Sequence, residues 1–241
     1  MHRPTGANHE HPDRLRVAMY AGIVFRRDAV SWSLLHKLAV LRRLIARGAR
    51  MDVTVFTHAM EDPAPEVIVA PSVAKLLARP EFFQADVHIF EGGMYYDLFD
   101  AIQVVPKDRP TLVFEHNSTP VALVDVDEAR LAVERSHLQR ANLLRATHVA
   151  CVSELNADLA RATGVAQERI SVLHLPPAVV PAGPNVALGA TEGPIRLLYL
   201  GRFVRAKGAL DMVDLAMRLQ AGHPGRFEVT MAGDPRFSDP E

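Results

Sequence analysis

The stretch RVAMYAGIVFRRDAVSWSLLHKLAVLRRLIARGARMDVTVFT, residues 16–57, decides the fold. It begins and ends with a short apolar run, and between these runs apolar residues recur with a helical period. The periodic positions share one face of the expected helix: Leu34, Leu38, Leu41 and Ile45. Gly48 then stands where a helix-ending glycine is expected. Two short strands joined by an amphipathic helix predict a βαβ unit with parallel strands.

The same alternation continues to residue 175. Strands are expected over residues 16–20, 52–57, 86–90, 111–115, 148–152 and 170–175. Helices are expected near residues 33–47, 72–78, 95–104, 127–145 and 154–163. Because mostly apolar strands are buried on both faces, helices should cover both sides of a parallel sheet. We therefore expect a doubly wound, Rossmann-like α/β domain over residues 16–175, with its ligand crevice outside the carboxyl ends of the strands.

Composition and charge exclude several classes of protein. The 241 residues are 49% hydrophobic and 23% charged, which excludes an intrinsically disordered chain. The net charge of −1 provides no basic excess for nucleic acid. No apolar run approaches the ~20 residues of a membrane span, and the polar N-terminus shows no secretory signal. We predict a cytoplasmic protein that binds no nucleic acid, and peripheral contact with the inner face of a membrane is left open.

The sequence offers few ligands for a metal ion. The single cysteine, Cys151, can form neither an internal disulfide nor a Cys-rich zinc site, and we expect it to be buried in a central strand of the sheet. The tripeptide His9-Glu10-His11 lies in a polar segment without a third ligand at helical spacing. We therefore predict no metal site.

Composition changes after residue 175. Residues 176–194 are rich in proline and glycine and lack periodicity, which is typical of a linker between domains. A strand at 195–200, a helix at 209–220 and a strand at 227–232 then form another βαβ unit. One such unit cannot cover both faces of its own sheet, so we expect residues 195–241 to be the incomplete beginning of a second domain. Residues 1–15 are expected to form a flexible tail.

A basic turn, LGRFVRAKG at residues 200–208, joins the strand and helix of this second βαβ unit. Arg202 should lie at the carboxyl edge of the sheet, and Lys207 and Gly208 at the helix N-terminus, where an anion is favoured. A guanidinium and an ammonium can together hold a diphosphate. The spacing alone fits a basic turn with two solvated side chains at least as well.

Four separated motifs carry a family resemblance. YLGR at 199–202, followed after four residues by Lys207-Gly208, resembles the signature of the GT-B-fold retaining glycosyltransferases of glycosyltransferase family 4. The other motifs resemble further family motifs in the right order: FEHNSTP at 114–120, ACVSELN at 150–156 and MAGD at 231–234. The resemblance runs from about residue 16 to 236. It implies a GT-B type fold, with the first Rossmann-like domain followed by a truncated second one.

The resemblance also implies roles for individual residues. In the family, the residues that match Arg202 and Lys207 bind the diphosphate of a nucleotide-sugar donor, and Gly208 belongs to the same site. A histidine at the place of His116 lies beside the donor sugar. Of the glycine pair that approaches the donor phosphate after the first strand, only Gly22 is matched here. Strand ends place four more residues at the cleft edge: Glu91, Gly92, Gly93 and Asn117. No catalytic nucleophile is assigned.

These roles imply a glycosyltransferase of the hexosyltransferase type. It would move a sugar from a nucleotide-diphosphate donor to an acceptor hydroxyl with retention of configuration, in glycan or glycoconjugate synthesis and without a metal cofactor. The acceptor could be a saccharide, a lipid-linked saccharide or a protein. The family's glutamate pair would lie beyond Glu241, so we expect residues 1–241 alone not to turn over.

Two alternatives remain open. One is a non-catalytic module, derived from such an enzyme, that binds a sugar nucleotide or a protein. The other is a nucleotide-sugar epimerase of the same two-domain fold, against which the spacing of Arg202 and Lys207 argues. A dehydrogenase is disfavoured because no G-x-G-x-x-G follows the first expected strand.

Overall fold

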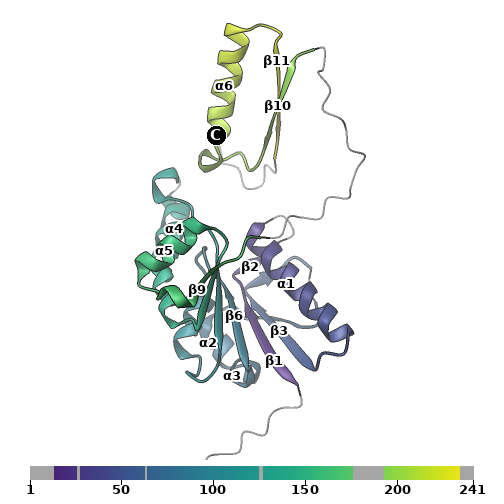
Figure 1. Ribbon diagram of the computed structural model, residues 1–241, viewed down its shortest axis with the longest axis vertical. Coiled ribbons are helices and arrows are strands. Elements are labelled where there is room, and N and C mark those ends of the chain that lie inside the picture. The colour runs from purple at the N-terminus through teal and green to yellow at the C-terminus, as the bar shows by residue number, and fades with distance from the viewer. Residues whose placement is uncertain (1–13, 26–27, 63, 125–126, 176–192, 234–241) are drawn as a thin grey trace, which may run out of the picture. The chain divides into compact units, whose positions relative to one another are not determined.

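The computed structural model describes residues 14–25, 28–62, 64–124, 127–175 and 193–233 (Figure 1). The chain divides into two compact units. The first comprises residues 1–118 and 131–175, and the second comprises residues 119–130 and 176–241. Most of the expected tail (1–15), nearly all of the expected linker (176–194), and Asp234 of the last motif lie outside the described residues.

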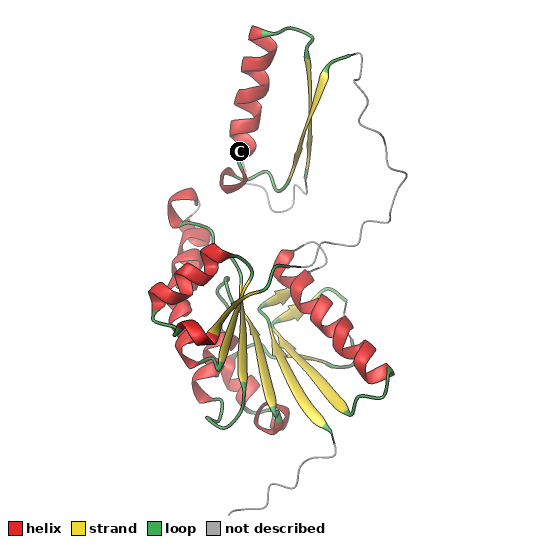
Figure 2. Ribbon diagram, viewed as in Figure 1, coloured by secondary structure: helices red, strands yellow, loops and turns green. Residues whose placement is uncertain are grey.

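A seven-stranded parallel sheet forms the centre of the first unit (Figure 2). In spatial order its strands are β5 (Val67–Val69), β3 (Met51–Thr57), β1 (Leu15–Tyr20), β6 (Val87–Glu91), β7 (Thr111–Glu115), β8 (His148–Cys151) and β9 (Ile170–Val172). From β1 the chain winds outward through β3 to β5, then returns to β6 and winds the other way. The doubly wound, Rossmann-like architecture predicted from the sequence is therefore confirmed, and its switch point lies between β1 and β6.

Helices connect these strands. Before β7 they are α1 (Ala29–Ala46), α2 (Val73–Leu77), α3 (Pro80–Gln84) and the 3₁₀ helix η1 (Asp97–Val104). After β7 they are η2 (Val121–Leu123), α4 (Asp127–Gln139), η3 (Arg140–Arg145), α5 (Glu154–Thr163) and η4 (Gln167–Arg169). None of the helices in the described part of the chain is long and apolar enough to cross a bilayer.

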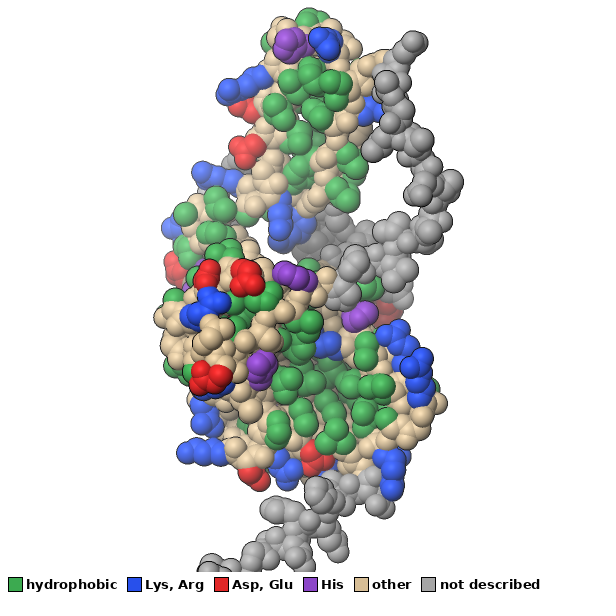
Figure 3. Space-filling model, viewed as in Figure 1, with side chains coloured by type: hydrophobic (Ala, Val, Ile, Leu, Met, Phe, Trp, Pro, Cys, Tyr) green, Lys and Arg blue, Asp and Glu red, His purple; other side chains and the backbone are tan. Residues whose placement is uncertain are grey.

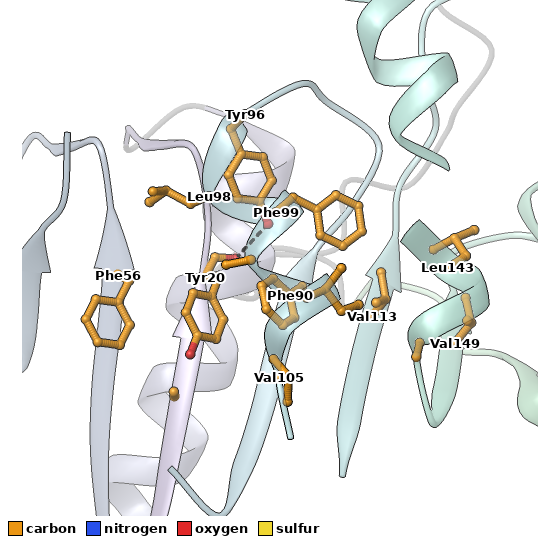
Figure 4. Close-up of a cluster of buried hydrophobic side chains, with 14 of the residues drawn as sticks. Tyr20, Phe56, Phe90, Tyr96, Leu98, Phe99, Val105, Val113, Leu143 and Val149 are labelled. Carbon is orange, nitrogen blue, oxygen red and sulfur yellow. Dashed lines mark hydrogen bonds between the residues drawn. The ribbon is translucent and has the colours of Figure 1, made fainter. Parts of the chain in front are cut away.

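Both faces of the sheet are covered, as the pattern of β1 shows. Val17 and Met19 pack with Leu34 of α1 in one apolar cluster. Ala18 and Tyr20 face the opposite side, in a second cluster that includes buried residues of α2, α3, η1, η3 and α5 (Figure 4). Alternate residues of one strand thus enter two separate cores, which is why the strand is apolar throughout.

The second cluster is rich in aromatic rings. Tyr20 stacks on Phe90 with ring centroids 4.1 Å apart and on Phe56 with centroids 5.3 Å apart. Cys151 is fully buried in β8, which has a strand on each side. The predicted burial of Cys151 in the interior of the sheet is therefore confirmed.

Several helix boundaries differ from the sequence-based expectation. Helix α1 begins four residues early because the Asp28 side chain accepts a hydrogen bond from the Ser31 amide at 2.8 Å and caps the helix. The expected helix at 127–145 continues beyond α4 as the 3₁₀ helix η3, and the one at 95–104 is the 3₁₀ helix η1. A short parallel pair, β2 (Ile23–Val24) and β4 (Ala59–Met60), was not predicted. Strand β2 follows β1 in the chain and β4 follows β3, so the pair lies just after the carboxyl ends of these two strands.

The second unit contains the predicted βαβ arrangement. Strand β10 (Ile195–Leu200) pairs in parallel with β11 (Phe227–Ala232), and η5 (Arg205–Lys207) and α6 (Ala209–Gly222) connect them. Among the described residues of this unit, only one face of β10 is covered: Tyr199 is buried, whereas Leu198 and Leu200 are 66% and 79% exposed. Figure 3 shows apolar side chains gathered on one side of this unit.

Candidate functional site

Two neighbouring strand ends form the polar centre of the first unit. Strand β6 ends at Glu91 and leads into Gly92-Gly93, and β7 ends at Glu115 and leads into His116. The strands are hydrogen-bonded in parallel register, so their carboxyl ends lie side by side. The structure therefore brings His116 together with the predicted cleft-edge residues, next to the switch point of the sheet.

Glu91 joins the other polar side chains of this centre, and its own side chain is fully buried. Its Oε2 lies 2.8 Å from His116 Nε2 and accepts a hydrogen bond from Ser33 Oγ at 3.2 Å. The Lys37 ammonium lies 2.9 Å from Glu91 Oε1 and 3.7 Å from the centroid of the Phe114 ring. Burial lowers the pKa of Lys37, and the Glu91 carboxylate opposes that shift. The carboxylate is thus paired with a cation as well as hydrogen-bonded.

The position of Glu91 fixes the tautomer of His116. A carboxylate can only accept, so the proton of this hydrogen bond lies on Nε2 of the imidazole. Nδ1 has no hydrogen-bond partner among the described residues. His116 is 4% exposed, so its ring is held in one orientation with Nδ1 available as an acceptor.

Glu115 forms a second buried ion pair beside the first. Arg140 Nε donates to Glu115 Oε1 at 3.3 Å. Burial raises the pKa of Glu115, while the charge and the hydrogen bond of Arg140 act against the rise. Ser118 donates to the Gly93 carbonyl at 2.9 Å and so ties the turn after β7 to the turn after β6. The Glu115–Arg140 ion pair and the Ser118 hydrogen bond therefore act together on the turn after β7.

The predicted glycines permit close packing. Gly93 has φ +95°, and a Cβ there would lie 2.5 Å from the His116 carbonyl oxygen. A Cβ on Gly92 would overlap Glu115 Oε2. At Gly22 a Cβ would lie 3.0 Å from Tyr96 Cβ, so a packing contact explains this glycine. Asn117 is exposed.

A cleft of about 400 Å³ opens beside this centre. It is lined by residues that follow β1, β3 and β6: Gly22, Ile23, His58, Met94, Tyr95, Tyr96 and Asp97. Of the predicted site residues, only Gly22 lines it. Sequence reasoning missed His58 and Asp97, yet His58 directly follows the end of β3, as His116 follows β7. The rule that drew attention to His116 could have found His58 as well.

The basic turn of the second unit differs from the polar centre of the first unit in the exposure and pairing of its charges. Arg202 and Lys207 are exposed, and neither side chain makes an ion pair or hydrogen bond with any described residue. Gly208 has φ +72° and is the N-cap residue of α6. The backbone of the turn is fixed: Tyr199 donates to the Arg202 carbonyl at 2.6 Å, and the Gly201 amide donates to the Ala232 carbonyl at 3.0 Å. Hydrogen bonds therefore hold the backbone of the turn, while the charged ends of Arg202 and Lys207 have no partner among the described residues.

The described parts of the two units present no metal centre. Among the described residues, no three His, Cys, Asp or Glu side chains are grouped so that they could hold an ion. His9 and His11 lie outside the described residues. The site geometry rests on paired charges and backbone groups.

Comparison with known proteins identifies the fold of this chain. No family model and no curated protein sequence matches the chain. Among solved structures, WaaG, a glycosyltransferase involved in lipopolysaccharide biosynthesis, is similar with a TM-score of 0.52 and 17% identity over 91% of this chain. The UDP complex of S. aureus MnaA is similar with a TM-score of 0.52 and 9% identity over 92% of this chain.

The chain has a GT-B type fold. It spans 64% of the length of WaaG and 63% of that of MnaA. At these identities the likeness establishes the architecture and leaves the activity open.

Proposed function

We propose that this chain is part of a glycosyltransferase that moves a sugar from a nucleotide-diphosphate donor to an acceptor hydroxyl with retention at the anomeric carbon. The observation that carries the proposal is the basic turn: Arg202 and Lys207 are exposed and unpaired within the described residues. Unpaired cations beside a helix start are suited to an anion. Similarity of the fold to a glycosyltransferase, WaaG, supports the same function.

Arg202 and Lys207 would act on the leaving group. As the bond between the anomeric carbon and the diphosphate breaks, negative charge grows on the phosphate oxygens. A guanidinium and an ammonium already in place stabilise that charge without reorganisation. The hydrogen bonds that fix the backbone of the turn support this preorganisation. No metal is needed for this step as we propose it.

The first unit would contact the sugars. His116 Nδ1 can accept a hydrogen bond from a sugar hydroxyl, because Glu91 keeps the proton on Nε2. We assign His116 to orientation of the donor sugar and Glu91 and Lys37 to positioning of His116. We propose that the enzyme is cytoplasmic and acts on a saccharide, a lipid-linked saccharide or a protein in glycan synthesis.

Nucleotide binding tests the proposal. Isothermal titration of the 241-residue chain with UDP, GDP and ADP at low salt should show binding of at least one nucleotide. Arg202→Ala and Lys207→Ala should each weaken it by at least about tenfold, the loss expected for one contact between charged groups. Arg226→Ala is the matched control, since Arg226 is an exposed arginine before β11, at the other end of the sheet. Equal affinity in all three variants would refute the assignment.

Product analysis then separates transfer from its alternatives. A nucleotide-sugar epimerase of the same two-domain fold is the second candidate, and the similarity of the fold to MnaA, whose structure holds UDP, is compatible with either enzyme. NMR of reactions with sugar nucleotides distinguishes a new glycosidic bond with retained configuration from an epimerised donor. Binding without either product in a polypeptide that carries both complete domains would favour a non-catalytic module. We expect residues 1–241 alone to bind a nucleotide and not to sustain turnover, because the described residues of the second unit cover only one face of β10.

A further inference from the structure

A second hollow lies at the open edge of the sheet in the first unit, away from the polar centre. It has a volume of about 290 Å³ and is lined by Val69, Pro71, Lys75, Ala78 and Arg79. Strand β5, which ends at Val69, is an edge strand, and β3 and β1 separate it from β6. The hollow is therefore distinct from the site at the ends of β6 and β7.

Two cations line this hollow without a partner. Lys75 and Arg79 are exposed, and neither side chain makes an ion pair or a hydrogen bond with any described residue. Of the carboxylates near them in the chain, Glu66 pairs with Arg42, and Glu81 does not line the hollow. Like charges that share one hollow repel each other, so an anion between them relieves that repulsion and is attracted to both.

The open edge of β5 adds a neutral donor. The Ala70 amide donates to the Thr57 carbonyl of β3 at 2.9 Å. The Glu66 carbonyl accepts a hydrogen bond from the Val55 amide of β3 at 2.8 Å. Because successive backbone groups of a strand alternate between its two edges, the N–H and C=O of Val69 point away from β3. No described strand pairs with β5 on that side, so the Val69 amide is available to a ligand.

The walls and the size of the hollow narrow the class of ligand. Val69, Pro71 and Ala78 offer apolar contact beside the two charges. A volume of about 290 Å³ is near the lower end of the ~300–1,000 Å³ typical of small-molecule sites. None of the described lining residues is acidic, so the hollow favours an anion over a cation. A compact ligand with two negative charges and a short carbon chain meets these conditions.

We propose that this hollow binds a small organic dianion, a phosphate monoester or a dicarboxylate, whose charged oxygens pair with Lys75 and Arg79 and whose carbon chain contacts Val69 and Pro71. The planar guanidinium of Arg79 can hold two oxygens at once, and Lys75 adds a point charge. This site is independent of the proposed donor site, because every lining residue belongs to the first unit and none belongs to the basic turn.

Amide NMR titration at low ionic strength provides the test. It starts from the double variant Arg202→Ala with Lys207→Ala, so that these two cations cannot bind the probe. The probes are glycerol phosphate and succinate at millimolar concentration, with inorganic phosphate as the bare ion and glycerol as the neutral comparison. At least one organic anion should shift the amide signals of Val69 and Arg79, and added salt should weaken its binding.

Variants of the two cations connect the binding to the hollow. Lys75→Ala and Arg79→Ala should each weaken it by about tenfold, the loss of one contact between charged groups. Lys75→Arg keeps the charge and should retain most of the affinity. Lys107→Ala, which removes an exposed lysine outside the hollow, should change nothing. Unfolding curves of the variants should match that of their parent, because the substituted side chains are exposed.

The possible results separate this site from the proposed function. The hollow is not such a site if neither organic anion shifts these signals, if glycerol shifts them equally, if inorganic phosphate binds as tightly as either organic anion, or if both alanine variants bind as their parent does. The tighter of glycerol phosphate and succinate identifies the charged group that the site prefers. Because the titrated chain lacks the Arg202 and Lys207 side chains, its failure to bind would leave the proposed nucleotide binding unaffected. A chain that binds no nucleoside diphosphate but binds an organic anion here would refute only the proposed function.

Discussion

The two charged regions of this protein differ in burial and in pairing. In the first unit, Glu91 and Lys37 form a buried pair next to His116, and Glu115 and Arg140 form another. In the second unit, Arg202 and Lys207 of the basic turn are exposed and unpaired within the described residues. Both regions lie at the carboxyl ends of parallel strands, so topology alone does not explain the contrast.

The contrast indicates different uses of charge. A buried pair loses much of its attraction to desolvation, so its benefit is a defined geometry for the groups around it. An exposed, unpaired cation pays little desolvation and remains available to an external anion. Substitutions in the first region should therefore change stability, and substitutions in the second should change ligand binding and turnover. Four predictions test this division.

The largest effect is expected from Lys37→Met. It leaves the Glu91 carboxylate buried without its cation, and breaking a buried pair costs about 3–5 kcal/mol. Urea unfolding measures the loss, with the exposed Lys75→Met as control. The double variant Lys37→Met with Glu91→Gln should recover part of it, since no uncompensated charge remains. A loss no larger than that of the control would contradict the claim that charges in the first region act on stability.

Next in size is the effect of the basic turn on catalysis. In a polypeptide that transfers sugar, Arg202→Ala and Lys207→Ala should each remove about 2–4 kcal/mol of transition-state stabilisation, or about two to three orders of magnitude in turnover. Their unfolding free energies should stay within about 0.5 kcal/mol of the parent, because neither side chain has a partner to lose among the described residues. Variants with a lowered unfolding free energy and normal turnover would contradict the prediction, because Arg202 and Lys207 would then act on stability and not on catalysis.

The third prediction concerns how the stability of the first unit depends on pH, and it rests on a buried imidazole in that unit. His88 in β6 is fully buried, and its Nδ1 lies 2.8 Å from the Tyr20 hydroxyl oxygen. Burial, reinforced by the Arg109 charge, lowers its pKa to about 4. Between about pH 4 and pH 6.5 the unfolded chain binds the proton and the folded chain does not, so stability falls as pH falls. The loss should reach about 2–3 kcal/mol.

Comparison of pH profiles isolates this group. His88→Gln keeps a partner for the Tyr20 hydroxyl but does not titrate, so its stability should fall less between pH 6.5 and pH 4. His36→Gln, in α1 and partly exposed, should keep the parent's slope. Glu115, whose pKa burial raises, acts with the opposite sign in all three proteins and cancels in the comparison. Parallel profiles for the parent and His88→Gln would contradict the prediction.

The sequence predicts the fold better than it predicts the site. Period and strand composition depend on near neighbours in the chain, so they reveal the parallel sheet, the stripe of α1 and the burial of Cys151. The rule that ligands gather at strand ends places Glu91, Gly93 and His116 at one edge. Lys37 lies in mid-helix, and nothing in its local pattern shows that it reaches Glu91. Contacts between residues more than fifty positions apart require the tertiary structure.

The smallest expected effect tests whether the geometry of the buried region depends on backbone packing as well as on charge. Gly93 and Gly48 have nearly equal positive φ values, +95° and +98°, so an alanine pays a similar conformational cost at either position. They differ in surroundings: an added Cβ meets the His116 carbonyl at 2.5 Å at Gly93 and nothing within 4 Å at Gly48. Gly93→Ala should therefore be less stable than Gly48→Ala by about 1–2 kcal/mol, within the range for overpacking. Because the overlap pushes on the turn that carries His116, Gly93→Ala should also shift the imidazole NMR signals of His116, while Gly48→Ala leaves them unchanged. Equal stabilities and unshifted signals would mean that the Glu91 and Glu115 ion pairs and the Ser118 hydrogen bond hold the two turns together without close packing at Gly93.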